Sequence, residues 1–573
     1  MSTSQSGRRS AAVLLSILAA ALLLRCYGLD HGLPDVVGVD DGFEIHRALR
    51  LGAGEFDFDR NGKGGFFYLL FLEYGAYFAG LLALGKVGGP TDFARAFATD
   101  LTPFWLIARA THALVGVLTV YWAFRLGRLC YGPRVGLVGA AATAVSLLSV
   151  SRSHFVGVDV PMTLLVLMVL ERAVRWADPE RPSRPVLLGL LFGGAVMTKI
   201  VAVVMVVPIA LANAWRHRDG SWRKRLLARP VLLAYVVAAV FFMLGNPGFV
   251  VNLAEFVGEA VAIVFGVGDD FQSPVAEAES RAPNLWLYYG RIVARDMGFP
   301  LFALAAAGAV LAALKRRRSD TILLATILTF YLLLAGSRTS HLFYPRYVLP
   351  LLPLLAILGG RLLRDGLELL GWTRARTATA LGILTVLLVG PSAVNSWKWA
   401  AERALEDTRV ASRTWFESHA QPDAAVFMVG NPVIYTAPNL SLPLRNRDAN
   451  VDRLIAELRE TEPSKAEMLR WRKEAASAPA FDLRTVRHFE PNGSLDDYLA
   501  AGIRYFVLDA LHFGESRLAR DRKHDDAVLA SRADLARACR TDPRVTLVYR
   551  AADDLPGLTG PTIEVYEARE STG

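Results

Sequence analysis

The sequence predicts an α-helical polytopic membrane protein, with about 11 transmembrane helices followed by an extracytoplasmic α/β domain. Two observations predict this fold class. Hydrophobic residues make up 53% of the 573 residues and charged residues only 20%, and the mean hydropathy is +0.32, above the range usual for soluble enzymes. The apolar residues also form long runs, and lysine and arginine collect in clusters between these runs, as they do in cytoplasmic loops.

The net charge of +9 does not indicate nucleic acid, because the basic residues are not gathered on one groove or helix face. We therefore expect no nucleic-acid partner. The three cysteines are far apart in the sequence and predict neither a disulfide framework nor a zinc site; they are Cys26, Cys130 and Cys539.

Arg8 and Arg9 precede the first apolar run and place the N-terminus on the cytoplasmic side of the membrane. The run at 11–24 has the length of a signal peptide, but no small-x-small cleavage pattern follows it, so a retained helix is expected. The expected organisation is a cytoplasmic N-terminus at 1–10, a membrane domain at 11–394 with outer loops at 28–102 and 244–297, and a soluble extracytoplasmic α/β domain at 395–573.

The positive-inside rule also decides between crossing and non-crossing segments. The apolar stretch at 66–84 contains Glu73, and a crossing there would put the next arginine cluster outside, so it is expected to lie in the outer interface. The stretch at 185–215 joins two basic loops and is expected to form two short helices that meet outside near Lys199. The other helices are expected at 103–124, 135–150, 160–176, 231–243, 298–315, 321–335, 347–362 and 377–394.

The last part of the chain has the composition of a soluble domain. Short β-like runs alternate with helical stretches such as 451–458, which predicts an α/β fold. The expected strands are 425–429, 505–508, 545–549 and 563–566. No phosphate-binding glycine loop and no repeat of solenoid period are found in the sequence.

An acidic pair, Asp40 and Asp41, follows the first helix, with Glu44 and Arg47 at helical spacing. A carboxylate at the outer membrane face acts as a base on a hydroxyl or holds a cation. The same residues also have the pattern of an acidic cap at a helix N-terminus. The loop by itself leaves both interpretations open.

Asp159 opens an otherwise apolar helix, where an ionisable side chain is costly unless it has a partner or a function. With Pro161 in the following turn, Asp159 is also suited to be the N-cap of that helix. The expected topology puts Asp159 on the same side of the membrane as Asp40, and a shared site is a hypothesis.

Several cations are expected on that face: Lys63, Lys199 and Arg346, the last next to Tyr347. Lys199 has apolar neighbours on both sides and needs either to snorkel or to pair with an anion. An anion held at the membrane surface, within reach of aliphatic chains, suggests a lipid phosphate. His154 and Arg152 lie at the same surface and either contribute to the site or act as interfacial anchors.

Residues 10–395 resemble the GT-C fold glycosyltransferases that use polyprenyl-phosphate sugars, because these motifs follow one another in the order typical of that family. That group includes the protein O-mannosyltransferases and the lipid A aminoarabinose transferases. The resemblance rests on the acidic pair after the first helix, the aspartate opening the fourth helix, the Thr-Lys turn at Lys199 and the string RYVLP around Tyr347.

The resemblance implies a role for each matched residue. Asp40 is the catalytic carboxylate, and Asp41 stands where the family usually has glutamate. Lys63 is a donor-phosphate ligand, although Gly62-Lys63-Gly64 replaces the family's usual Glu-Lys-Pro or His-Pro-Pro string. The remaining implied roles are donor-phosphate binding by Lys199, Arg346 and Tyr347, and an acceptor, metal or sugar site at Asp159 and His154.

The implied reaction moves a sugar from a polyprenyl-phosphate carrier to a lipid, polysaccharide or protein hydroxyl on the outer face, with inversion at the anomeric carbon. No nucleotide is needed, and a divalent cation held by Asp40 and Asp159 is possible without being required. Two other classes stay open: a lipid or sugar transporter or flippase, in which the intramembrane charges serve a pathway, and a non-catalytic relative that binds glycan.

Overall fold

The computed structural model describes residues 2–35, 41–54, 65–254, 258, 284–336, 344–430, 442–487, 490–514 and 526–569. Two compact units can be distinguished. The membrane unit comprises Met1–Tyr27, Arg50–Leu72 and Ala108–Ala400, and the α/β unit comprises Gly28–Leu49, Glu73–Ile107 and Ala401–Gly573.

Six of the described helices are long and apolar enough to cross a membrane, or up to eight if each of two bent helix pairs forms one span. This confirms the polytopic helical class, whereas the number of 11 spans stays a prediction. The six are α1 (Ser2–Cys26), α3 (Phe66–Ala83), α5 (Thr102–Tyr131), α11 with α12 (Trp222–Leu227 and Arg229–Gly245), α18 (Arg318–Gly336) and α20 (Arg374–Arg403). Because α3 meets the same criterion as the spans, its interfacial position also stays a prediction.

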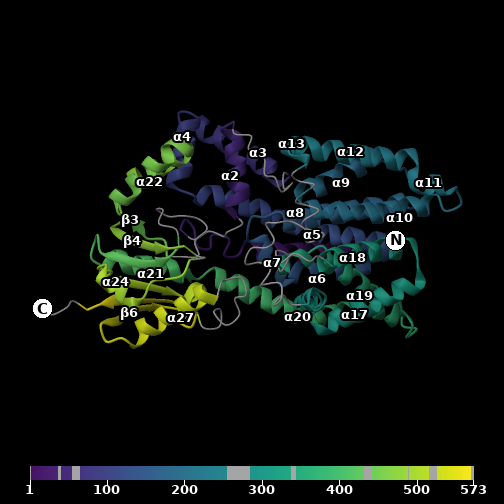
Figure 1. Ribbon diagram of the computed structural model, residues 1–573. Coiled ribbons are helices and arrows are strands. Elements are labelled where there is room, and N and C mark those ends of the chain that lie inside the picture. The colour runs from purple at the N-terminus through teal and green to yellow at the C-terminus, as the bar shows by residue number, and fades with distance from the viewer. Residues whose placement is uncertain are drawn as a thin grey trace. The chain divides into compact units, whose positions relative to one another are not determined.

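The two bent pairs are α6 with α7 (Pro133–Val145 and Leu147–Ser153, 58°) and α16 with α17 (Leu285–Met297 and Phe299–Lys315, 117°). The shorter elements of the membrane unit are α8 (Asp159–Trp176), α9 (Pro185–Thr198), the 3₁₀ helix η1 (Ile200–Met205), α10 (Val206–Arg216), α13 (Pro247–Val251), the 3₁₀ helix η4 (Pro345–Val348) and α19 (Leu351–Glu368). Helices α8, α9 and α10 lie side by side, as do α17 and α19 (Figure 1).

The break between α6 and α7 exposes backbone groups that both a charged donor and a charged acceptor satisfy. The buried guanidinium of Arg25, at the end of α1, donates to the carbonyl oxygens of Ala144 at 2.9 Å and Thr143 at 3.3 Å. The carboxylate of Asp296 accepts from the Leu148 amide and the Ser146 hydroxyl, both at 2.7 Å. A cation thus lies at a helix C-terminus and an anion at a helix N-terminus, the favourable arrangement for both helix dipoles.

Replacing Arg25 by methionine is expected to lower the free energy of unfolding by about 2–5 kcal/mol, because buried carbonyls lose their donor. The measurement is the thermal midpoint of the purified protein in detergent. Ser16→Ala is the matched control, since Ser16 is exposed on the same helix and bonds only to the Ala12 carbonyl at 3.2 Å. Equal midpoints for both variants would refute the capping role of Arg25.

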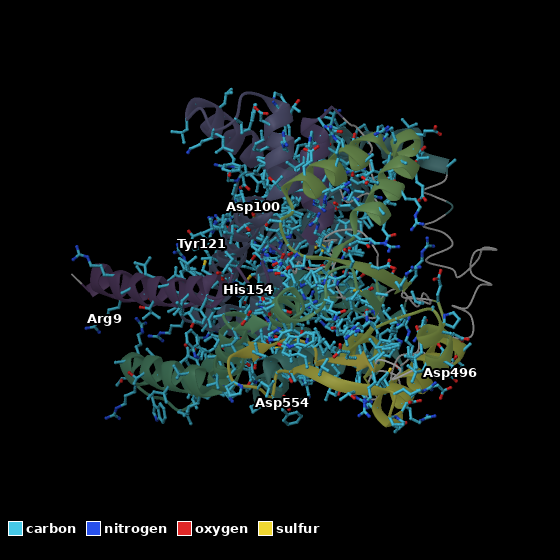
Figure 2. All side chains as sticks on the ribbon, turned by 90° about the vertical axis from the view of Figure 1, so that its left-hand side faces the viewer. Arg9, Asp100, Tyr121, His154, Asp496 and Asp554 are labelled. Carbon is cyan, nitrogen blue, oxygen red and sulfur yellow. The ribbon has the colours of Figure 1, made fainter. Side chains whose placement is uncertain are left out.

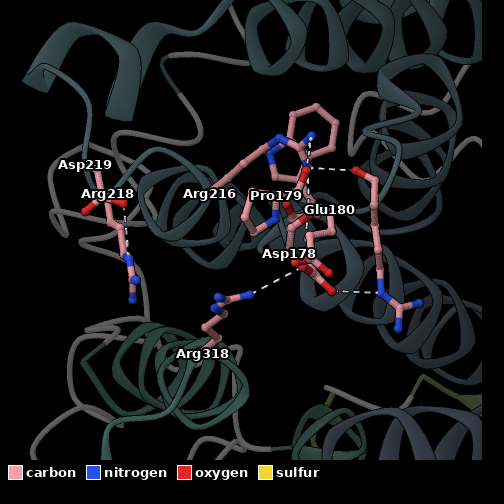
Figure 3. A network of polar contacts seen from close by, with 9 residues as sticks. Asp178, Pro179, Glu180, Arg216, Arg218, Asp219 and Arg318 are labelled. Atoms are coloured by element: carbon pink, nitrogen blue, oxygen red, sulfur yellow. Dashed lines mark hydrogen bonds and ion pairs between the residues drawn. The ribbon is translucent and has the colours of Figure 1, made fainter.

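A second polar network lies at the C-terminal end of α8 (Figure 3). Arg216 of α10 donates to the carbonyl oxygens of Asp178 at 2.9 Å and Trp176 at 3.1 Å, and the Asp178 carboxylate pairs with Arg181 at 3.0 Å and Arg318 at 3.5 Å. Since α8 has 18 residues and an α-helix rises about 1.5 Å per residue, this network lies roughly 27 Å from Asp159. It ties α8 to α10 and α18.

The α/β unit contains a six-stranded sheet of order β3-β4-β2-β5-β8-β6, in which β3, β4, β2 and β5 are parallel and β8 is antiparallel to both neighbours. The strands are β2 (Ala425–Val429), β3 (Arg445–Asn446), β4 (Ala480–Val486), β5 (Tyr505–Asp509), β6 (Val545–Ala551) and β8 (Ile563–Ala568), with β1 (Glu406–Asp407) and β7 (Leu558–Thr559) forming a separate parallel pair. All four predicted strands are present, whereas β3 and β4 of the sheet and the short pair of β1 and β7 were missed.

The side chains of the central strands pack alternately into two different hydrophobic cores. In β2, Val426 and Met428 face one core while Phe427 and Val429 face the other. This explains why the central strands appear in the sequence as continuous apolar runs. The helices of the unit are α2 (Asp41–Gly52), α4 (Pro90–Thr99), α21 (Thr408–His419), α22 (Asp448–Thr461), α23 (Pro463–Ala475), α24 (Leu495–Ala500), α25 (Ala510–Phe513) and α27 (Asp526–Thr541).

Asp407 gives this unit a predictable acid sensitivity. Burial disfavours its charge, but hydrogen bonds from Arg409 and His31 and the charge of Arg409 outweigh burial and lower the pKa of Asp407 below its usual value. A carboxyl with a lowered pKa stabilises the fold above about pH 4, and that contribution is lost as the pH falls towards the folded-state pKa.

We therefore expect the urea concentration at the unfolding midpoint of the full chain to decrease when the pH is lowered below about 4. Unfolding is measured by labelling of the buried Cys539 with a disulfide reagent that reacts in acid. Asp407→Asn should lower the midpoint at neutral pH and flatten this decline. Asp534→Asn, at an exposed site, serves as the control. An Asp407→Asn profile parallel to the wild type would contradict the assignment.

Candidate functional site

The described site is built around Asp159, the first residue of α8. The N-cap is Val158, so the expectation that Asp159 caps the helix was wrong. The carboxylate instead points to two cations: Oδ1 accepts from Lys199 Nζ at 2.6 Å, and Oδ2 lies 3.3 Å from Arg346 Nε. Asp159 is only 7% exposed, and a buried carboxylate is stable only when it is paired in this way.

Lys199 lies in the turn between α9 and η1, where the sequence placed the junction of two short helices. Its extended backbone ends α9 at Thr198, and its side chain is 8% exposed. Nζ lies 4.0 Å from the ring centroid of Tyr347, and the Arg346 guanidinium lies 4.1 Å from that of Tyr344. The structure thus brings together Asp159, Lys199, Arg346 and Tyr347, here called the Asp159 cluster, from α8, the α9–η1 turn and η4.

Three further residues support the Asp159 cluster and were not singled out from the sequence. His112 of α5 contacts the carbonyl oxygen of Gly157 at 2.7 Å and so holds the segment before α8. A side chain at Gly65 would place its Cβ 2.6 Å from Thr198 Oγ1, so only glycine allows the chain to approach the lysine turn there. The glycine string GKGG around Lys63 was the available signal; a lone histidine in an apolar helix gives none.

The third residue that supports the Asp159 cluster is Tyr289 of α16. Helix α16 packs against η4, the 3₁₀ helix that contains Tyr347. Tyr289 is fully buried, and its hydroxyl has no hydrogen-bond partner within the described residues. A buried hydroxyl without a partner costs free energy, so this donor is available for a ligand beside the Asp159 cluster.

His154, labelled in Figure 2, follows α7 and does not join the Asp159 cluster. Its Nδ1 and Nε2 lie 3.0 Å from the carbonyl oxygen of Val150 and 3.1 Å from that of Tyr27, and its ring stands edge-on to Trp399 at 4.8 Å. These contacts tie α7 to the chain that follows α1. The acceptor, metal or sugar role of His154 stays a prediction.

The acidic pair is only partly described. Asp41 is the first residue of α2 and is fully buried in the α/β unit, where Glu44 is also buried and lies 3.5 Å from Arg47. Asp40 and Lys63 lie outside the described residues. The roles that the sequence assigns to these residues therefore stay predictions.

The Asp159 cluster fits an anion better than a metal ion. Among the residues that the structure describes, no group of three or more His, Cys, Asp or Glu side chains is placed to hold a metal. A divalent cation at Asp159 would also face Lys199 and Arg346, which repel it. Among the described residues, two cations contact one carboxylate here, and such a pair of cations suits an anionic ligand.

Comparison with known proteins identifies part of the membrane unit. Residues 104–244, which contain Asp159 and Lys199, match the model of a family described as dolichyl-phosphate-mannose-protein mannosyltransferase. No curated protein matches the sequence.

Several solved structures are distantly similar. The apo oligosaccharyltransferase of Archaeoglobus fulgidus is 12% identical, with 91% of this chain and 72% of that chain covered and a TM-score of 0.46. ArnT from Cupriavidus metallidurans bound to undecaprenyl phosphate is 15% identical, with 98% of both chains covered and a TM-score of 0.48. The mycobacterial arabinofuranosyltransferase AftD is 16% identical, with 99% of this chain and 40% of that chain covered and a TM-score of 0.41. Over the segment that carries Asp159 and Lys199, the family match confirms the resemblance to the GT-C glycosyltransferases that was seen in the sequence.

Proposed function

We propose that the chain is an integral membrane glycosyltransferase that moves a sugar from a polyprenyl-phosphate carrier to an acceptor hydroxyl on the extracytoplasmic face of a bacterial inner membrane. The Asp159 cluster carries this proposal. Its two cations, Lys199 and Arg346, suit the phosphate of a sugar phosphodiester, and its burial in an apolar unit suits a ligand with a lipid chain.

The reaction follows from where charge develops. When the bond between the anomeric carbon and the phosphate oxygen breaks, its electron pair goes to the phosphate and the sugar ring becomes oxocarbenium-like. Lys199 and Arg346 stabilise the growing phosphate charge by charge-assisted hydrogen bonds. Asp40, assisted by Asp41, accepts the proton of the acceptor hydroxyl as that oxygen attacks the opposite face of the sugar, which inverts the anomeric carbon.

Within this mechanism Asp159 is a counter-ion. It keeps the two cations charged and oriented while the site is empty, and it shares them with the phosphate once the donor binds. Tyr289, on the helix that packs against η4, contributes a hydroxyl donor.

The test is transfer by the purified full chain in liposomes, with a panel of radiolabelled polyprenyl-phosphate sugars and envelope extract as the acceptor source. Wild type should consume one donor and label the extract, Asp40→Asn should not, and Asp30→Asn, an exposed neighbour in the same loop, should retain activity. Movement of labelled donor across the liposome without consumption would establish the transporter class instead. Glycan binding without consumption of any donor would establish a non-catalytic relative.

A further inference from the structure

The chain segment just after α1 is anchored to the start of the C-terminal domain by contacts within the α/β unit. Gly28 approaches the backbone of Arg403 and Ala404 so closely that a Cβ would lie 2.8 Å from it. His31 Nδ1 lies 3.1 Å from the Arg403 carbonyl oxygen, and its Nε2 lies 3.5 Å from the Asp407 carboxylate. These contacts fix residues separated by more than 370 positions in the sequence.

An ion pair completes the anchor. The carboxylate of Asp35 pairs with the guanidinium of Arg413, which projects from α21. The Asp35 side chain is 9% exposed; burial raises its pKa, and Arg413 opposes that rise. Substitution of either residue removes this ion pair, which links the segment after α1 to α21.

The helix that begins at Asp41 is held from another side as well. His46 of α2 packs edge-on against Phe97 of α4 at 5.5 Å and against Trp105 at 6.1 Å. Helix α4 in turn is bound to α23: Arg95 pairs with Glu474 at 3.0 Å, and Arg472 donates to the Ala98 carbonyl oxygen at 3.0 Å. The C-terminal domain therefore contacts both the segment that precedes the acidic pair and the helix that supports α2.

From these contacts we infer that the C-terminal domain holds α2, which begins at Asp41, in position for catalysis, with Arg413 as the positioning residue that acts through Asp35. Asp35 precedes Asp41, the first residue of α2, by six positions, so the anchor at Asp35 lies close in the sequence to the start of that helix. This inference rests on the proposed function for its catalytic meaning, whereas the anchoring itself is a property of the fold.

The experiment is a charge-reversal cycle in the full chain, using Arg413→Glu, Asp35→Arg and the double variant. Hydrogen exchange reports protection of the α2 amides, and transfer kinetics report kcat and the donor KM. Each single variant should lower α2 protection and reduce kcat by about tenfold or more while the donor KM stays within about twofold, and the double variant should restore both. Arg537→Glu, which breaks an exposed pair with Asp534 on α27, is the matched control and should change neither.

Unchanged α2 protection in both single variants would overturn the inference, and so would a double variant that is no better than the singles. Amide protection in β5 shows whether the sheet is still folded; if Arg413→Glu unfolds it, Arg413→Gln decides the question by the same criteria. If wild type transfers no sugar, the proposed function fails, and the exchange measurement still decides whether Arg413 anchors the segment.

Discussion

Replacing Lys199 by methionine is expected to lower sugar transfer from the polyprenyl-phosphate donor by about 100- to 1,000-fold. The ammonium group is one of two cations in the Asp159 cluster, and loss of a single charged donor at a site of developing negative charge costs a factor of this size. Methionine preserves most of the length and the apolar contacts of the side chain, so the loss reports on the charge. The measurement is the initial rate of transfer at saturating donor.

Two variants complete that test. Lys199→Arg keeps the charge and should retain a larger part of the rate, while Lys224→Met, at an exposed position of α11, should leave the rate unchanged. A rate within threefold of wild type for Lys199→Met would remove this lysine from the reaction.

Asp159→Asn is expected to strengthen binding of the polyprenyl monophosphate product and to slow turnover, because the product is released more slowly. Loss of the carboxylate raises the net charge of the Asp159 cluster by one unit, so the polyprenyl monophosphate product should bind about tenfold more tightly and leave more slowly. Without a ligand, Lys199 and Arg346 lose the carboxylate that both contact, which should lower the thermal midpoint, and added polyprenyl phosphate should restore it.

Equilibrium binding of the monophosphate and thermal midpoints with and without it provide the measurement. Asp178→Asn is the control, because Asp178 pairs with Arg181 and Arg318 at the other end of the same helix (Figure 3). Weaker binding of the monophosphate to Asp159→Asn would show that Asp159 contacts the ligand in some role other than that of a counter-ion.

Periodicity and charge were sufficient to predict most of the fold. The junction at Lys199 was predictable because basic loops on both sides require an even number of crossings, and strand β2 was predictable because its residues are apolar on both faces. Strand β4 was missed because Asp482 and Arg484 interrupt its apolar pattern. In the structure those charges are paired, Asp482 with Arg447 at 3.2 Å and with Arg484 at 2.8 Å.

The candidate site was predictable where a charge stands in an apolar context. Asp159 and Lys199 met that criterion, and the structure places them 2.6 Å apart. Arg25 and Asp296 did not, because each lies at the end of a helix where a charge looks ordinary, and their acceptors and donors are more than 100 positions away. His154 was included because it lies near the same membrane surface, but its contacts with backbone carbonyls depend on tertiary structure that no local pattern encodes.

The central claim, that the Asp159 cluster binds a lipid phosphate, is tested most directly by native mass spectrometry of the full chain with polyprenyl monophosphate. Three proteins are compared: wild type, the double variant Lys199→Met with Arg346→Met, and Arg318→Met as a control outside the cluster. The structure predicts one bound lipid for wild type and for the control, and loss of that lipid in the double variant. Equal occupancy in all three proteins would contradict the claim.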